Sequence, residues 1–254
     1  MSPKLFLFLP VIFLSFTLHS ESPNETWRKI LAENSECVTW VSASVRIEIS
    51  ANGRSYPPSE RNIEALGTIL DASGMTVLSL NQLDPTDSIQ NKIRNYQADI
   101  KVNYTEVKIL LQDGTEIPAE FVLKDDDLDL AYIIPQATSK EGKIADNTSF
   151  AHVRRNPDTP APQVLDGVVS LGKLGPNLYR QSTLLRGWVN AVIKKPRDYF
   201  VIENVSPGTP VFDEMGNWLG VSLFKKDMGR PSGLITLPAG DILEIAEQVR
   251  LRHQ

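Results

Sequence analysis

Residues 107–131, VKILLQDGTEIPAEFVLKDDDLDLA, decide the fold. Apolar and polar side chains alternate on either side of Asp113-Gly114, a dipeptide that closes tight β-hairpins. The three aspartates at 125–127 indicate a second turn, because their carboxylates accept backbone hydrogen bonds and tolerate turn conformations. The stretch therefore predicts three antiparallel strands joined by two turns, at 107–112, 116–123 and 128–134.

Short strands continue on both sides of this stretch, separated by turns rich in glycine and proline. Upstream, alternation predicts a strand over 38–49, and 66–80 is predicted to form a hairpin with its turn at 71–74. A loop is predicted over 52–62, and a long loop with at most one helical turn over 84–100. Downstream, further strands are predicted at 164–171, 183–193, 199–202, 210–212, 218–224 and 233–237.

Two sets of about six short strands indicate two packed antiparallel six-stranded β-barrels, which is an all-β fold. Apolar residues spaced for one face of a helix end the chain, so the sequence predicts a C-terminal helix. Asn24 is a candidate N-cap for a shorter helix near the start. The predicted order is a signal peptide at 1–20, a helical segment at 21–37, a first barrel at 38–150, a proline-rich connector at 151–162, a second barrel at 163–238 and the closing helix at 239–254.

The N-terminus has the pattern of a secretory signal peptide. Lys4 precedes an apolar run over 5–18, and the small residues Ser20 and Ser22 follow it. The run is shorter than the roughly 20 residues of a membrane-spanning helix. We therefore expect cleavage near Ser20 or Ser22, no stable membrane span afterwards, and a secreted or periplasmic protein; an uncleaved anchor is the alternative.

The composition excludes several classes of function. The formal net charge of −5 argues against nucleic acid or an anionic membrane as the main partner. Cys37 is the only cysteine, so no intrachain disulfide can form, and we expect it in the core. The acidic run 125–127 is predicted to be a solvated turn, and no metal or cofactor site is expected. Four N-x-[ST] sequons, relevant only where the host glycosylates secreted proteins, begin at Asn24, Asn103, Asn147 and Asn204.

Three segments, in this order, resemble the chymotrypsin-like serine proteases, and specifically the HtrA-type branch. Residues 66–83, LGTILDASGMTVLSLNQL, are similar to the family's hairpin that ends at its histidine. Residues 107–131 are similar to the family's D-G … A … D-L-A stretch, and 207–221, PGTPVFDEMGNWLGV, to its serine loop. The resemblance spans about residues 38–250. It implies a trypsin-like fold and leaves no room for the PDZ domain that often follows.

The family's reaction needs a serine nucleophile, a histidine base, an aspartate that orients it and backbone N–H groups for the oxyanion. The resemblance places the histidine at Asn81, the aspartate at Asp129 and the serine at Pro207. An amide is not a base near neutral pH, and proline has neither a hydroxyl nor an N–H. We therefore predict a pseudo-protease and no enzyme, in which Asp129 accepts hydrogen bonds in a structural role.

Three hypotheses about function remain open. The first is a non-catalytic module whose inter-barrel cleft binds an extended peptide or protein by strand addition. The second is an active serine endopeptidase with a rearranged site, in which Ser206 is the nucleophile and His152 or His253 the base. The third is a structural surface protein that uses an outer barrel face.

Overall fold

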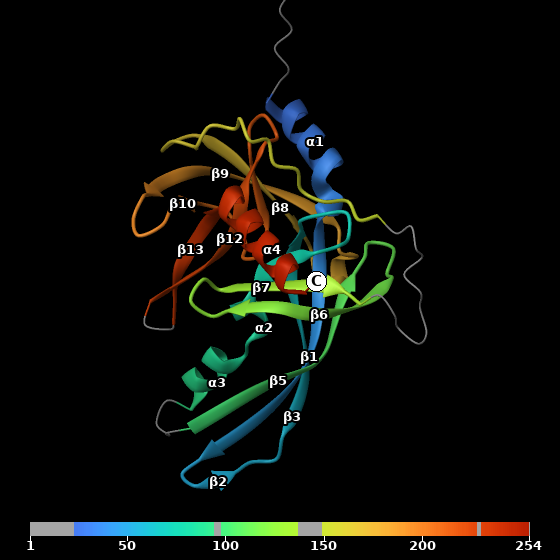
Figure 1. Ribbon diagram of the computed structural model, residues 1–254, viewed down its shortest axis with the longest axis vertical. Coiled ribbons are helices and arrows are strands. Elements are labelled where there is room, and N and C mark those ends of the chain that lie inside the picture. Colours follow the sequence, from blue (N-terminus) through green and yellow to red (C-terminus); the bar gives the residue numbers. More distant parts are fainter. Residues whose placement is uncertain (1–22, 94–97, 137–148, 228–229, 254) are drawn as a thin grey trace, which may run out of the picture.

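The computed structural model describes residues 23–93, 98–136, 149–227 and 230–253. Its strands close into two six-stranded antiparallel β-barrels, which confirms the predicted fold class (Figure 1). The first barrel has the order β1-β3-β4-β7-β6-β5 and closes where β5 returns to β1. The second has the order β10-β13-β12-β11-β8-β9 and closes where β9 pairs with β10.

The first half of the chain contains both helices and strands. In chain order they are α1 (Pro23–Asn34), the 3-10 turn η1 (Ser35–Cys37), β1 (Val38–Ala51), β2 (Arg54–Ser55), β3 (Ser59–Ile69), β4 (Thr76–Ser79), α2 (Leu80–Leu83), α3 (Thr86–Lys92), β5 (Ala98–Leu110), β6 (Glu116–Asp125) and β7 (Leu130–Pro135). The second half contains β8 (Gly167–Lys173), the 3-10 turn η2 (Pro176–Leu178), β9 (Ser182–Ile193), β10 (Tyr199–Ile202), β11 (Pro210–Asp213), β12 (Trp218–Asp227), β13 (Arg230–Pro238) and α4 (Ala239–His253).

Most predicted elements are present near their predicted positions. In β1 the alternate residues Val41, Ala43, Val45 and Ile47 are buried, as a strand with one core face requires. The 66–80 hairpin is confirmed as the end of β3, a turn and β4. The predicted strand at 164–171 begins later, because 164–166 form a turn that hydrogen-bonds to Val189 before β8 starts. The predicted connector, 151–162, contains no helix or strand.

The loop predicted at 52–62 is wrong over much of its length. Asn52 and Gly53 have positive φ angles of 53° and 72°, the geometry of a type I′ hairpin turn, and they join β1 to β2. β3 then starts at Ser59. Its first four side chains are exposed and polar, so no hydrophobic alternation marks this part of the strand, and its backbone pairing with β1 sustains it.

The long loop predicted at 84–100 is also wrong. α2 ends before this range, but α3 occupies seven residues of it and β5 begins at Ala98; residues 94–97 lie outside the described part. Of the seven residues of α3 only Ile89 is buried, so the sequence shows no apolar stripe that would have predicted the helix.

One apolar core joins the two barrels and both terminal helices. Trp27 and Ile30 of α1 and Ile242, Ala246 and Val249 of α4 are buried, which confirms both predicted helices. The predicted N-cap is wrong, because α1 begins at Pro23 and Asn24 lies inside it. The other fully buried members of this cluster come from both barrels: Val77, Leu130, Tyr132, Val169, Val221 and Leu223. The predicted signal peptide and Asn147 lie outside the described residues. Among the described helices, none is long and apolar enough to cross a membrane.

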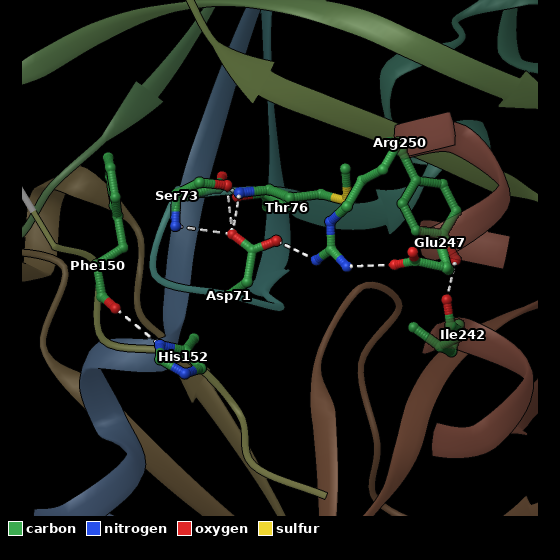
Figure 2. A network of polar contacts seen from close by, with 11 residues as sticks. Asp71, Ser73, Thr76, Phe150, His152, Ile242, Glu247 and Arg250 are labelled. Carbon is green, nitrogen blue, oxygen red and sulfur yellow. Dashed lines mark hydrogen bonds and ion pairs between the residues drawn. The ribbon is translucent and has the colours of Figure 1, made fainter. Parts of the chain in front are cut away.

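Polar contacts tie α4 to the first barrel, and Figure 2 shows them at close range. Arg250 of α4 forms an ion pair with Asp71, in the turn between β3 and β4, and also reaches Glu247 at 2.9 Å. Nearer the N-terminus of α4, the Tyr132 hydroxyl of β7 donates to the Ile242 carbonyl oxygen at 2.9 Å. These contacts attach the helix that follows the second barrel to one turn and one strand of the first.

Candidate functional site

Asp129 lies between the two barrels, immediately before β7, and its side chain is fully buried. Its carboxylate accepts hydrogen bonds from Ser79 Oγ at 2.6 Å, from the Asn81 backbone N–H at 2.7 Å and from the Phe224 backbone N–H at 2.8 Å. The donors belong to β4, α2 and β12. Burial raises the pKa of Asp129 above its ordinary value, although all three hydrogen bonds favour the ionised form.

Asn81 is in contact with Asp129 through its backbone only. Its side-chain Nδ2 donates to Asp87 Oδ2 of α3 at 3.0 Å, so the amide is held toward α3. The resemblance assigned the base of the family's reaction to this position. The group that stands there is an amide, which accepts no proton near neutral pH.

Pro207 belongs to the loop between β10 and β11, and this loop is pressed against the first barrel. Gly208 has φ +78°, its N–H donates to the Ser222 carbonyl oxygen at 2.7 Å, and its own carbonyl oxygen accepts from Thr68 Oγ1 at 2.9 Å. A Cβ on Gly208 would lie 2.0 Å from the Leu66 carbonyl oxygen. Only glycine permits this close approach, which places Pro207 at the boundary between the barrels.

The three predicted positions come together at this boundary. Gln82, next to Asn81 in sequence, has its Oε1 atom 3.6 Å from where a Cβ on Gly208 would stand. Asn81 in turn donates to Asp129. The segments Asn81-Gln82 and Pro207-Gly208 are therefore neighbours, at the boundary where Asp129 also lies.

The candidates for a rearranged catalytic site do not assemble in the same way. The Ser206 carbonyl oxygen accepts a hydrogen bond from Thr209 Oγ1 at 2.6 Å, so Ser206 is part of a tight turn. His152 lies 2.9 Å, through Nδ1, from the Phe150 carbonyl oxygen (Figure 2). It lines a separate open cavity together with Glu33 and Asn34 of α1. His253 is exposed at the end of α4. Within the described residues, neither histidine hydrogen-bonds to Ser206.

Two open clefts meet at Asn81 and Asp87. The larger, of about 680 Å³, is also lined by residues of α3 and of the start of β13: Gln90, Asn91, Ile93, Arg230 and Pro231. The other, of about 500 Å³, has a strongly charged lining, with Asp84, Thr86, Asp126, Asp127, Lys225 and Lys226. Both clefts are open to solvent and lie beside the Asn81–Asp129 contact.

The end of β12 forms one wall of the smaller cleft and has a free strand edge. β12 pairs with β13 from Gly220 to Asp227, but its pairing with β11 stops at Val221. Beyond that point the Phe224 N–H is taken by Asp129. Among the described strands, none pairs with the edge of Lys225–Asp227 that faces away from β13. An edge of this kind can accept an added strand.

The described residues contain no group of three or more His, Cys, Asp or Glu side chains placed to hold a metal ion. Asp125 Oδ1 accepts from the backbone N–H groups of Asp127 and Leu128, and Asp126 pairs with Lys226 at 3.7 Å, so the acidic run is a turn. Cys37 is buried in the core as predicted, and its burial raises the pKa of the thiol to about 12.

Sequence reasoning missed several residues that build this region. Ser79 ends an apolar strand, and a buried hydroxyl there could have been noticed as needing an acceptor. Asp87 gave no signal, because it lies in a segment interpreted as a loop. Gln82 gave none either, although its buried Oε1 has no hydrogen-bond partner among the residues that the structure describes.

No family model and no curated protein matches the chain. Among solved structures, 329 chains are similar to it. One of them is the HtrA-type protease AlgW with a tripeptide, with 14% sequence identity and a TM-score of 0.55. The similarity covers 88% of this chain and 63% of that one, so the present chain spans less than two thirds of its length. At this identity the likeness establishes the fold, and the chain has the trypsin-like double-barrel fold of HtrA-type proteases.

Proposed function

We propose that the protein is a non-catalytic module on a trypsin-like scaffold, and that it binds an extended peptide or a segment of a partner protein in the inter-barrel cleft. The observation that carries this proposal is the Asn81 amide, which is hydrogen-bonded to Asp87 where a protease needs an imidazole beside its aspartate.

Two features argue against catalysis. The Asp129 carboxylate accepts hydrogen bonds from a serine hydroxyl and two backbone N–H groups, and no imidazole contacts it within the described residues. Pro207 removes the hydroxyl nucleophile and one N–H donor at once. Loss of one oxyanion donor alone typically costs about 2.7–4 kcal/mol of transition-state stabilisation.

Two other features support peptide binding. The free edge of β12 offers backbone groups to an added strand, and strand addition does not require a catalytic triad. The charged linings of the two clefts supply polar side chains at the same place. The similar AlgW structure contains a tripeptide, which is consistent with a peptide site on this fold.

The catalytic part of the proposal is tested with a fluorophosphonate probe, which labels activated serines. We expect no labelling of the protein under conditions that label trypsin fully. Labelling that disappears in Ser206→Ala would contradict the proposal and establish the rearranged endopeptidase.

The binding part is tested with a library of extended peptides by fluorescence anisotropy. A bulky side chain in the smaller cleft, Thr86→Trp, should abolish the binding found for the unmodified protein. The same change in the exposed β5–β6 turn, Thr115→Trp, should leave it unchanged. If no peptide binds, the structural surface protein becomes the better hypothesis.

We also propose that residues 1–20 direct export and are removed. Mass spectrometry of the exported protein should show an N-terminus close to Ser20 or Ser22. A full-length product held in the membrane would instead establish the uncleaved anchor.

A further inference from the structure

The first barrel extends beyond its closed part as a three-stranded arm, visible below the barrels in Figure 1. In this arm β1 pairs with β3 on one side, as far as Ile47↔Ser59, and with β5 on the other, as far as Ala51↔Ala98. β5 pairs with β6 only over 107–110. Residues 98–106 of β5 therefore have a strand neighbour on one side, and no other described strand pairs with their second edge.

This edge carries the charged residues Asp99, Lys101 and Glu106, but it lacks most of the other features that protect an exposed strand. It contains no proline, and its only irregularity is the bulge at its end, opposite Ser44 and Val45. One face carries the half-buried side chains Ile100, Val102 and Tyr104. The other face is polar and exposed. A regular, alternating and unpaired edge favours pairing with another strand.

We propose that this edge pairs with the same edge of a second copy of the chain, antiparallel about a two-fold axis at Val102. The axis keeps each face of the sheet on the same side, so apolar residues meet apolar ones. Ile100 is then opposite Tyr104, and Val102 is opposite its own copy. On the polar face Lys101 is opposite Asn103, and no like charges oppose each other.

The neighbouring registers are less favourable. An axis at residue 101 places Lys101 opposite its own copy, which brings two like charges together. An axis at residue 103 places Ile100 opposite the exposed Glu106. Among the axes at residues 101, 102 and 103, the axis at Val102 is the most complementary, and this self-complementarity argues for a second copy as the partner. None of the residues that line the two clefts belongs to 98–106, so the inference is independent of the proposed function.

Two opposite substitutions at the exposed Asn103 test both the contact and its register. In the proposed dimer a side chain at 103 faces Lys101 of the other copy. Asn103→Lys should raise the dimer Kd about fivefold, and Asn103→Glu should lower it about fivefold. Sedimentation equilibrium on the chain without its predicted signal peptide measures both values. With an axis at residue 103, both variants would dimerise more weakly, because the charged side chain at 103 would then face the same side chain of the other copy.

The matched controls are Asn62→Lys and Asn62→Glu, which make the same charge changes on β3, at the opposite side of the arm. They should leave the dimer Kd unchanged. Because Arg46 faces Asn103 across the β1–β5 ladder, thermal midpoints must show that all four variants remain folded. A monomer at every concentration, a dimer insensitive to residue 103, or equal effects of the Asn62 variants would overturn the proposal.

Discussion

The Asp129 carboxylate accepts hydrogen bonds from donors of both barrels: Ser79 Oγ, the Asn81 N–H and the Phe224 N–H. Asp129→Asn replaces one acceptor oxygen by an NH₂ group that faces a donor. We expect the free energy of unfolding to fall by about 1–3 kcal/mol, the cost of an unsatisfied buried donor. Urea unfolding measures it, and Asp113→Asn, in an exposed turn, is the control that should change little. A stability equal to that of the unmodified protein would contradict the structural role of Asp129.

Gly208 gives a second prediction, because it combines a positive φ with contact to another backbone. A Cβ there would collide with the Leu66 carbonyl oxygen, whereas a Cβ on Gly114, which also has a positive φ, would meet nothing within 4 Å. Gly114→Ala should therefore cost only the backbone strain, about 1–2 kcal/mol, and Gly208→Ala clearly more. Urea unfolding of the two variants compares them, and equal losses would show that the loop can move away from β3.

The sequence was informative about single residues where a spacing could be compared with a known pattern. Asn81, Asp129 and Pro207 were chosen in this way, and the structure brings them to one boundary. Ser79 and Asp87 could not be chosen, because their roles depend on hydrogen bonds across the fold that no local pattern encodes.

The contact between α4 and the β3–β4 turn gives a prediction about pH. Burial of the Asp71 carboxylate raises its pKa, but hydrogen bonds from Ser73, Arg250 and Met75 outweigh this effect, so the pKa lies below its usual value. The stabilisation is therefore present above the unfolded pKa of about 3.9, and it is lost as the pH falls through the folded value. Both side chains are partly exposed, so Asp71→Asn should cost only about 1 kcal/mol at neutral pH.

That deficit should shrink as the pH falls below the unfolded pKa of about 3.9, and it should disappear once Asp71 is protonated in the folded protein as well. Denaturant unfolding at neutral pH and at a series of acidic pH values measures it. Glu247→Gln, which changes the more exposed partner of Arg250, is the matched control and should have a smaller effect. A deficit that is constant with pH would show that the ion pair does not contribute.

Whole elements were predictable where one face is buried and the other is not. β1 begins at Val38 as predicted, because its burial alternates along the strand, and β10 spans its predicted residues because turns flank a short apolar run. β2 and the start of β3 were missed, since their side chains are exposed and only backbone pairing with β1 holds them; the Asn52-Gly53 turn was the one available signal. α3 was missed because a single buried isoleucine makes no periodic pattern.

At the level of the whole molecule, the two barrels share one core, and α4 is where their stabilities are coupled. Ile242 is fully buried, and its cluster includes Tyr132 of the first barrel and Leu223 of the second. A residue in such a position stabilises both barrels at once, so we expect the chain to unfold as a single cooperative unit. Separate cores would instead allow the barrels to unfold in two steps.

Ile242→Ala tests this coupling. It should lower the free energy of unfolding by about 2–5 kcal/mol, the usual cost of a large-to-small change in a core. Hydrogen exchange followed by mass spectrometry measures the protection of backbone amides in each barrel separately. In this variant the amide protection should fall in both β7 and β12. Val45→Ala, in a cluster confined to the first barrel, should cost less because fewer methyl groups are removed. Loss of protection in β12 alone after Ile242→Ala would mean that α4 belongs energetically to the second barrel, and that the barrels unfold independently.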